Sequence, residues 1–341
     1  MNRPQPRAAV IGVGRMGARH LAALQQQGVD VVAASDLVAE RLEEAKRLYP
    51  GIRGYLDWQE LLERERFDLA CVATTAPSHA AIVIGAAAAG VPRILCEKPL
   101  ATNLEAGRQM LSACRAAGTR LAVNYSRRRF APYRQIAQRI AGDTFGEVRF
   151  MRATCGAAGL ANAGTHAFDL MRWFCGPAVA VTGFIDSRPL PNPRGAQFVD
   201  PGGHGVIEFS EGRRATFDFT ADFSSGFVIE FGCRFGRVLV REQYRAIHAS
   251  ARSADTRDRP LNDYSIPMEE IPLDFSTPVD IVAMTATMID NILSDDPPAC
   301  TGEDALGSLE VTAAVHVSHL EGHRRVELPL QDDRGSLSAI A

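Results

Sequence analysis

A lysine in this sequence stands where it could stabilise negative charge on a reacting oxygen. Lys98 lies in Cys96-Glu97-Lys98-Pro99, directly after an apolar segment that predicts a buried strand over 94–96. In open α/β sheets, ligands bind beyond the carboxyl ends of the strands. A lysine there can donate to a substrate hydroxyl or carbonyl and stabilise an oxyanion, and Glu97 could hold it by charge and hydrogen bonding. We therefore predict that Lys98 is catalytic; the alternative is an exposed lysine in the turn before Pro99.

A histidine at the start of a predicted helix could exchange a proton with the same substrate group. His166 lies in Asn162-Ala-Gly-Thr-His-Ala-Phe-Asp169 and begins a helix expected over 166–175. The apolar stripe of that helix excludes His166 and is expected to pack inward. It consists of Ala167, Leu170, Met171 and Phe174. Because a helix N-terminus disfavours imidazolium, His166 should stay neutral near neutral pH and suit a general base; the alternative is a structural histidine.

A glycine-rich turn could hold the phosphates of a dinucleotide. Gly12-x-Gly14-x-x-Gly17 follows an expected strand over 8–11 and opens a helix over 16–27. In such a turn the first glycine allows the tight bend, the second lets the backbone approach a pyrophosphate, and the third allows close helix–strand packing. The anion then lies at the helix N-terminus, where N–H groups and the helix dipole favour it. Arg15 and Met16, inside the turn, are included among the predicted cofactor-binding residues.

An acidic residue after the second strand bears on the choice of cofactor. Asp36 lies about 20 residues after the last glycine, where a carboxylate can accept from both ribose hydroxyls and would repel a 2′-phosphate. Leu37 follows it, rather than an arginine that could pair with that phosphate. These features favour NAD over NADP. A role for Asp36 as the N-cap of a helix over 38–48 is the alternative, and it does not exclude the ribose contact.

The elements that must position these residues alternate between strand and helix in the first part of the chain. We expect strands over 8–11, 29–34, 69–73, 94–96 and 121–124, and helices over 16–27, 38–48 and 78–89. A further helix is expected from the capping box Thr102-Asn-Leu-Glu105 to Gly118. This alternation implies a parallel sheet with helices on both faces. We therefore predict an α/β Rossmann domain over 1–123 that binds the dinucleotide.

The second part of the chain has few helices between its strands. Strands are expected over 147–154, 179–185, 205–209, 215–220, 227–231 and 237–240, and helices over 132–141, 166–175 and 304–319. The polar segment 242–272, which contains several prolines, is expected to be a loop. The pattern predicts an α+β domain over 124–341 with an open-faced, mostly antiparallel sheet that binds substrate and mediates oligomerisation.

Length and composition limit the classes of protein to which the sequence can belong. The chain has 341 residues, which is enough for two domains. Its 46% hydrophobic and 23% charged residues are typical of a globular protein in water. A formal net charge of −3 excludes the strongly basic footprint of a nucleic-acid-binding protein. Arg127-Arg128-Arg129 is the only dense basic run, and such a run is usually a solvated face.

The apolar segments and the cysteines indicate where the protein acts. No apolar core of signal-peptide length precedes the first strand. The longest apolar region, 69–91, is interrupted by Pro77, Ser78 and His79, so no membrane span is expected. The seven cysteines form no Cys-x-x-Cys pair, which favours a reduced cytoplasm and argues against a structural metal.

Taken together, these motifs resemble the Gfo/Idh/MocA family (glucose–fructose oxidoreductase/inositol dehydrogenase). The resemblance covers nearly the whole chain, and Glu97-Lys98-Pro99 is its most specific element. The other matching elements are Gly12-x-Gly14-x-x-Gly17 with Asp36, Thr74-x-x-Pro77-x-His79, Asn162-x-Gly164-x-His166-x-x-Asp169 with Trp173 and Gly176, and the ending from Ser318 to Pro329.

The resemblance implies a fold, a substrate class and residue roles. It implies that Lys98 and His166 form the catalytic pair, that Thr74, Pro77 and His79 form part of the cofactor wall, and that Glu97 lies near the nicotinamide half. Substrates in the family are usually sugars or cyclitols, and the outer face of the sheet often makes an oligomer contact. We therefore expect a small-molecule polyol or sugar substrate, no nucleic-acid or membrane partner, and a homodimer or homotetramer formed through the open sheet. The predicted substrate-binding residues are Tyr125, Arg127, Arg128, Asn162, Thr165 and His166.

Two features depart from the family pattern. Inositol-type members carry an aspartate four residues before the histidine, where this chain has Asn162. Asparagine can orient His166 or bind a substrate hydroxyl, but it cannot carry a proton as a carboxylate does. The run Ser126-Arg-Arg-Arg-Phe130 is one residue longer than the family's Arg-Arg-Phe element, so one or two of these arginines could face a substrate, including an anionic one.

Three functions are compatible with these features. The first is an NAD(P)-dependent dehydrogenase or reductase that moves a hydride between nicotinamide and a ring carbon of a sugar, sugar derivative or cyclitol. The second is a lyase or glycosidase without net redox change, in which bound NAD oxidises the substrate transiently; Asn162 motivates it. The third is a catalytically silent NAD-binding regulatory protein, a class that tends to lose the lysine or the histidine, both of which are present here.

Overall fold

The computed structural model describes residues 5–190, 195, 199–243, 245–276 and 279–331. It divides into two compact units, one comprising Met1–Arg129 and Asp280–Leu306 and the other Phe130–Val279 and Gly307–Ala341. The division after residue 129 lies six residues beyond the expected end of the first domain, and the segment 280–306 returns to the first unit. It does so because helix α8 (Ile281–Leu293) packs against α1 (Arg15–Gln26) and β5.

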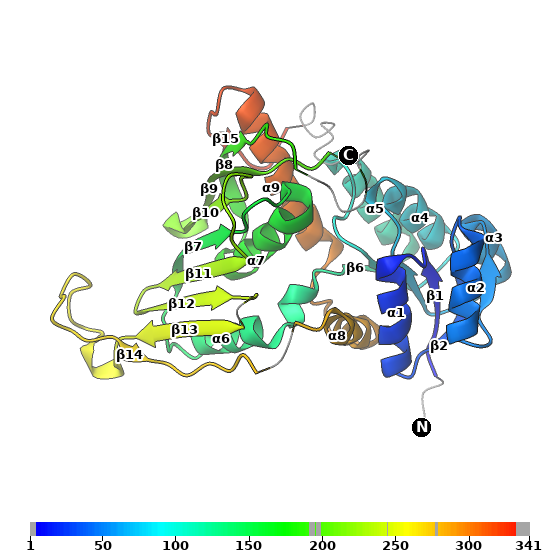
Figure 1. Cartoon of the computed structure of the whole chain (residues 1–341), viewed down its shortest axis with the longest axis horizontal. Helices are drawn as coiled ribbons and strands as arrows, with labels where there is room; N and C mark the ends of the chain where they lie inside the picture. The colour runs from blue at the N-terminus through cyan, green and yellow to red at the C-terminus, as the bar shows by residue number, and fades with distance from the viewer. Residues whose placement is uncertain (1–4, 191–194, 196–198, 244, 277–278, 332–341) are drawn as a thin grey trace. The chain divides into compact units, whose positions relative to one another are not determined.

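The first unit is built on a six-stranded parallel sheet, sheet A, in the order β3-β2-β1-β4-β5-β6, of which Figure 1 labels β2, β1 and β6. Its strands are β1 (Arg7–Ile11), β2 (Asp30–Ser35), β3 (Arg53–Tyr55), β4 (Leu69–Val72), β5 (Arg93–Cys96) and β6 (Arg120–Val123). Strand β4 is buried along its whole length, as expected for a central parallel strand covered on both faces. The expected Rossmann fold is confirmed.

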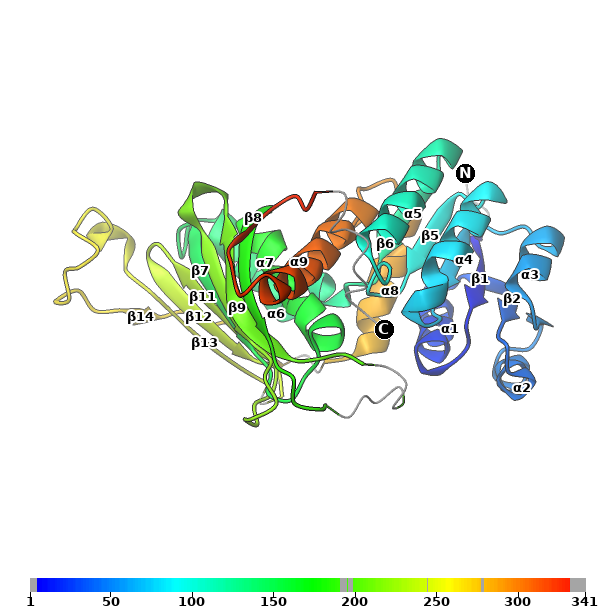
Figure 2. The ribbon, with the colours of Figure 1, turned by 90° about the horizontal axis from the view of Figure 1, so that it is seen from above.

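Helices cover both faces of sheet A. They are α1, α2 (Ala39–Leu48), α3 (Trp58–Arg64), α4 (Ala76–Ala88), α5 (Leu104–Ala117) and α8. The strand order runs outward from β1 in two directions, and right-handed crossovers therefore place the helices of the two halves on opposite faces. Helix α1 packs with α8, and α4 packs with α5 (Figure 2).

Three details of the first unit differ from the sequence-based expectations. Strand β3 and helix α3 were not predicted, and neither was α8. The expected capping box at Thr102 is wrong, because α5 begins one residue later and Asn103 is its N-cap, accepting a hydrogen bond from the N–H of Ala106. The expected C-terminal stop at Gly118 is confirmed, since this residue adopts the left-handed conformation at φ +69°.

The second unit contains a nine-stranded sheet, sheet B, in the order β14-β13-β12-β11-β7-β10-β9-β8-β15. Its strands are β7 (Val148–Thr154), β8 (Ala178–Ile185), β9 (Gly203–Phe209), β10 (Arg214–Asp218), β11 (Val228–Cys233), β12 (Gly236–Arg241), β13 (Ala246–Ala251), β14 (Glu269–Glu270) and β15 (Val326–Glu327). All neighbours pair antiparallel except β7 and β10, which are parallel. The expected open, mostly antiparallel sheet is confirmed.

The segment 242–272 is not entirely loop, contrary to the expectation. It contains β13, which pairs with β12 from Gly236↔Ala251 to Arg241↔Ala246, and the short β14. The sequence of β13 is Ala-Ile-His-Ala-Ser-Ala, whose buried residues are two small alanines. Such a strand gives almost no apolar alternation, which explains why the sequence did not reveal it.

One face of sheet B is covered by helices and carries the core of the second unit. The helices of this unit are α6 (Ala131–Ala141), α7 (Thr165–Cys175) and most of α9 (Gly302–Leu320). Phe168 of α7 contacts Phe217 of β10 edge to face, with ring centroids 5.0 Å apart. Gly183 of β8 lies so close to α9 that a Cβ atom there would be 2.8 Å from Val315 Cγ1. Within the described part of the chain, no helix is both long and apolar enough to cross a membrane.

Candidate active site

The glycine turn after β1 has the geometry that a dinucleotide needs. Gly12 adopts φ +88°, and a Cβ atom there would lie 2.8 Å from Thr74 Cγ2. A Cβ atom at Gly17 would lie 1.9 Å from the carbonyl oxygen of Gly12. At Gly14, by contrast, the nearest atom would be the Nη1 of Arg41 at 3.7 Å. The first and third glycines are therefore required by protein packing, whereas the second borders open space into which a ligand could fit.

The N-terminus of α1 provides the positive end of a helix at that open space. Within the described residues, no side chain caps α1 and no acidic residue lies in its first turn. Arg15 and Met16 are the first two residues of this helix. A helix end with unsatisfied N–H groups attracts phosphate oxygens. The residues present thus fit the pyrophosphate of NAD, whose contacts with Arg15 and Met16 stay a prediction.

Asp36 joins the end of β2 to the glycine turn. Its Oδ2 accepts from the N–H of Val13 at 2.9 Å, and its Oδ1 accepts from the N–H of Val38 at 3.0 Å. Helix α2 begins at Ala39 and has no side-chain cap, so Asp36 does not act as its N-cap. Each carboxylate oxygen has a second lone pair with which to accept from a ribose hydroxyl. The arrangement fits the predicted ribose contact.

An arginine that the sequence analysis did not consider lies beside Asp36. The Nη1 of Arg41 is 3.4 Å from Asp36 Oδ1, and the Arg41 side chain is about half exposed. It belongs to α2, one turn after the end of β2. Arg41, as well as Leu37, therefore bears on whether a 2′-phosphate could bind at this end of the site.

Thr74, Pro77 and His79 occupy the turn after β4 and the first turns of α4. Thr74 contacts Gly12 and accepts at Oγ1 from Ser78 at 2.8 Å, and Pro77 is exposed. His79 is 1% exposed; its Nδ1 lies 2.9 Å from the carbonyl oxygen of Pro99, and its Nε2 lies 3.2 Å from that of Thr74. Burial lowers the pKa of His79. His79 thus ties the turn after β4 to the turn after β5, and direct contact between these three residues and a cofactor stays a prediction.

Glu97 and Lys98 follow β5 at the same edge of sheet A. Glu97 is buried, its N–H donates to the carbonyl of Val72 at 2.8 Å, and its carboxylate Oε1 lies 2.8 Å from His20 Nε2. Asn124, after β6, donates its Nδ2 to the same carboxylate oxygen at 2.7 Å. Lys98 is the next residue and is partly exposed. Strands β1, β4 and β5 are neighbours in the sheet, so the glycine turn and Lys98 lie at one edge, two strands apart.

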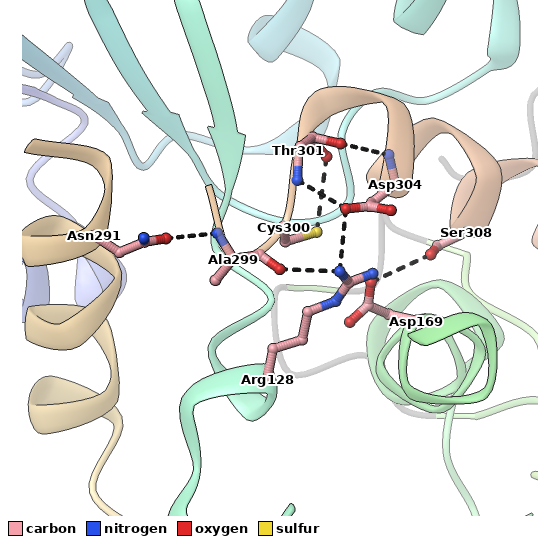
Figure 3. A network of polar contacts seen from close by, with 8 residues as sticks. All are labelled: Arg128, Asp169, Asn291, Ala299, Cys300, Thr301, Asp304 and Ser308. Carbon is pink, nitrogen blue, oxygen red and sulfur yellow. Dashed lines mark hydrogen bonds and ion pairs between the residues drawn. The ribbon is translucent and has the colours of Figure 1, made fainter. Parts of the chain in front are cut away.

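The predicted substrate-binding residues of the first unit lie after β6. Tyr125 is completely buried, and Arg127 and Arg128 belong to the 3₁₀ turn Ser126–Arg129. Arg128 is 6% exposed, and its Nη1 donates to the carbonyl of Ala299 at 3.0 Å and pairs with Asp304 Oδ2 at 3.1 Å (Figure 3). These contacts fix Arg128 within its own unit, and the substrate contacts of all three residues stay predictions.

Asn162, Thr165 and His166 lie together in the second unit. Asn162 belongs to a π-helical turn, Leu160–Gly164, that runs directly into α7, and Gly164 between them has helical backbone angles. His166 therefore does not lie in the first turn of its helical segment, as the sequence suggested, but in the second. The expectation that a free helix N-terminus acts on its ring is wrong for this reason.

An aspartate far along the chain caps this helical segment. Asp200 accepts from the N–H of Ala161 at Oδ1 (2.8 Å) and from the N–H of Asn162 at Oδ2 (2.9 Å). A carboxylate at a helix N-terminus satisfies orphan donors and interacts favourably with the dipole. On the other side of α7, Asp169 accepts from Ser308 at 3.5 Å (Figure 3). Asp200 thus holds the turn that carries Asn162 and leads to His166.

Sequence reasoning missed His20, Arg41, Asn124 and Asp200 as supporting residues. Arg41 could have been suspected, since it lies only five residues after Asp36 at the start of an expected helix. The partner of His20 is 77 residues away, and no local pattern marks it. Asn124 and Asp200 follow no local pattern. Among the described residues, no group of three or more histidine, cysteine or acidic side chains could hold a metal ion.

Comparison with known protein families gives two matches. The profile of the oxidoreductase family with an NAD-binding Rossmann fold, Gfo/Idh/MocA, matches residues 6–125. The profile of the Gfo/Idh/MocA C-terminal domain matches residues 133–239. The matches cover the glycine turn, Asp36, Lys98 and His166.

Individual relatives match over most of the chain. A D-apiose dehydrogenase of Paraburkholderia graminis is 28% identical over 94% of this chain and 89% of its own length. An inositol 2-dehydrogenase of Pseudarthrobacter chlorophenolicus is 30% identical over 65% of this chain and 69% of its own length. Among solved structures, the WlbA dehydrogenase of Bordetella pertussis in complex with NADH and UDP-GlcNAcA aligns with a TM-score of 0.75 and 23% identity, covering 96% of this chain and all of that one. The chain belongs to the Gfo/Idh/MocA family of NAD-binding oxidoreductases.

Proposed function

We propose that this protein is an NAD-dependent dehydrogenase or reductase that acts on a CH–OH group at a ring carbon of a sugar, sugar derivative or cyclitol. The observation that carries the proposal is the common edge of sheet A, where the glycine turn, Asp36 and Lys98 follow β1, β2 and β5. In open α/β sheets this is the edge at which ligands bind.

The proposed roles follow from the chemistry of each residue. NAD, when bound, supplies the acceptor or donor of the hydride. In the oxidative direction, His166 takes the proton of the substrate hydroxyl as a general base. Lys98 donates to the same oxygen and stabilises its developing negative charge. Asn162 orients His166 or binds a second hydroxyl, and Tyr125, Arg127, Arg128 and Thr165 contribute to substrate binding.

The substrate class rests on the relatives. Two of them act, by their names, on apiose and on inositol, and these compounds are a ring-forming sugar and a polyhydroxylated ring. A substrate with several hydroxyl groups suits a site with asparagine, threonine and arginine side chains, which donate or accept hydrogen bonds.

The decisive experiment measures nicotinamide absorbance with a panel of sugars and cyclitols. The wild-type protein should reduce NAD with at least one of them, and Lys98→Met should lower kcat by about a hundredfold to a thousandfold, the usual cost of a lost oxyanion donor. Lys46, an exposed residue of α2 paired with Glu43, is the only other lysine, so Lys46→Met is a matched control that should keep full activity. Unchanged turnover in Lys98→Met would end the assignment.

We further propose that the protein works in the cytoplasm as a homodimer or homotetramer formed through sheet B. None of the seven cysteines, all of which lie among the described residues, is joined in a disulfide, which suits a reducing compartment. The face of sheet B opposite its helices carries exposed apolar side chains, including Phe184 of β8 and Val206 of β9. Light scattering of the wild type and of Val206→Arg tests this assembly: the charge should shift the protein toward a smaller species.

A further inference from the structure

A buried histidine of the first unit, His20, contacts the residue next to Lys98. His20 belongs to α1 and is completely buried, and its Nε2 lies 2.8 Å from Glu97 Oε1. Asn124 donates to the same oxygen and also, at 3.2 Å, to Thr285 Oγ1 of α8. Three segments, α1, the turn after β5 and the turn after β6, thus meet at one carboxylate, and α8 is joined to them through Asn124.

Both partners of this contact carry charge. Burial alone lowers the pKa of His20, but its contacts with Cys71 and Glu97 outweigh burial and raise the pKa to about 10. Burial raises the pKa of Glu97, but the hydrogen bond and charge of His20 outweigh it and hold this pKa below its usual value. The other titratable groups facing the pair are Cys71, Cys96, His79 and Lys98. His20 and Glu97 are therefore an ion pair inside the unit.

This ion pair changes the electrostatic environment of the Lys98 ammonium group. The charge of Lys98 also lowers the pKa of Glu97, so two cations compete for one carboxylate. An isolated buried carboxylate would bind the ammonium group of Lys98 strongly and raise its pKa. With His20 in place, the negative charge of Glu97 is shared between two cations, and its attraction for the Lys98 ammonium is weaker than that of a carboxylate without a second partner. On the other side of Lys98, the carbonyl of Pro99 accepts from His79, so the turn is held at both ends.

We propose that His20 is a positioning residue for Lys98: it anchors Glu97 and shares its negative charge, and so weakens the attraction that Glu97 exerts on the Lys98 ammonium. This inference deepens the proposed function and rests on the role of Lys98 given there. His20 is completely buried and acts on Lys98 through Glu97.

The experiment measures the titration of Lys98 directly. The full-length protein is acetylated with trace acetic anhydride over a range of pH, and mass spectrometry of the two lysine-containing peptides gives the reactivity of Lys98 and of Lys46. Because the chain has only these two lysines, Lys46 serves as an internal reference in every sample. The proteins compared are the wild type, His20→Gln, Glu97→Gln and the double variant.

His20→Gln should raise the midpoint of Lys98 by about one pH unit relative to Lys46, the size of shift produced by an unbalanced neighbouring carboxylate. Adding Glu97→Gln should return the midpoint toward the wild-type value, because the carboxylate is then gone as well. An unchanged or lowered midpoint in folded His20→Gln would overturn the proposal, as would a double variant that keeps the raised midpoint. A purely structural role of His20 would lower the melting temperature without moving the midpoint.

Glu97→Gln alone provides a second test if His20→Gln does not fold. The Lys98 midpoint should then fall relative to Lys46, since the carboxylate that favours its ammonium form is gone; no change would contradict the proposal. The labelling needs no substrate, so it separates this inference from the proposed function. If the midpoints move as expected but the wild type oxidises no sugar, the proposed function fails and the ion-pair effect stands. If the wild type is active, the alkaline limb of the plot of kcat against pH should shift between the wild type and each variant by the same amount as the Lys98 midpoint.

Discussion

The two predicted catalytic residues are supported in different ways. Lys98 follows Glu97, whose buried carboxylate is paired with His20 and bonded to Asn124. His166 follows a helical turn whose backbone N–H groups are capped by the partly exposed Asp200. The first support is a charge pair between side chains in the interior of a unit, and the second is a backbone cap near its surface.

This difference determines how the protein should respond to substitutions in the His20–Glu97 pair and at the Asp200 cap. Removing one partner of a buried ion pair leaves an uncompensated charge in a medium that solvates it poorly. Removing a cap exposes N–H groups that water can reach. We therefore expect the support of Lys98 to be the more sensitive of the two to substitution and to pH.

The largest expected effect is that of Glu97→Ala. This change leaves the His20 imidazolium without its partner, and the loss of one member of a buried pair typically costs about 3–5 kcal/mol. Urea unfolding of the variant and the wild type at neutral pH measures the difference. The double variant His20→Gln, Glu97→Ala is the control and should regain part of the loss, because no charge is then buried. A loss below about 1 kcal/mol in the single variant would show that the pair is not ionic.

The same pair predicts how stability depends on pH. The pKa of His20 is raised from 6.5 to about 10, so its stabilising contribution is fully present below pH 6.5 and is lost as pH rises toward 10. The pKa of Glu97 is lowered, so its contribution is present above its usual pKa of 4.5 and is lost as pH falls through the lowered value. Unfolding free energies of the wild type should decline between pH 6.5 and about 9, below the range in which buried cysteines with raised pKa values contribute, and His20→Gln should lack most of that decline. Parallel curves for the two proteins would contradict the assignment.

A smaller effect is expected at the other support. Asp200→Ala removes the acceptor for the N–H groups of Ala161 and Asn162 and should cost about 1–2 kcal/mol, the usual range for a lost cap. Asp200→Asn should recover only part of this loss, because its amide has one acceptor oxygen for the two N–H groups that the two carboxylate oxygens accept. If Asp200 also positions His166, kcat for the active sugar should fall most in the alanine variant and less in the asparagine variant. Full stability of the asparagine variant would contradict a role for both carboxylate oxygens.

The sequence predicted the parts of the fold that have strong local patterns. Strands β1, β4 and β5 are short apolar runs, and α5 ends at a glycine where one was expected. Helix α8 was missed because two of the three residues on its exposed stripe, Ala283 and Thr287, are uncharged, so that the hydropathy of the sequence marks this stripe clearly only at Asp290. The packing of α8 against α1 and β5 depends on residues far away in the sequence, which a short stretch of sequence does not reveal.

The same distinction holds for the candidate site. The glycine turn, Asp36 and Lys98 were predicted because strand ends and glycine spacing are local signals. The supports of the site were not, since His20 meets Glu97 across 77 residues and Asp200 meets Asn162 across 38. The residue types at those positions are ordinary for a helix and a loop, and only the fold brings them to their partners.

The smallest expected effect concerns the preference for NAD over NADP. It compares a charge that is held by backbone hydrogen bonds with one that is exposed. Asp36 is held by two backbone N–H groups, whereas Arg41, at 3.4 Å, is about half exposed and can move. Asp36→Asn keeps an acceptor for the backbone but removes the charge that repels a 2′-phosphate, and it releases Arg41 to pair with that phosphate. The ratio of NADP to NAD affinity, measured by fluorescence titration, should rise about tenfold, equivalent to about 1.4 kcal/mol. In the double variant with Arg41→Ala most of this gain should disappear; a gain of the same size would mean that the loss of repulsion at position 36 acts alone.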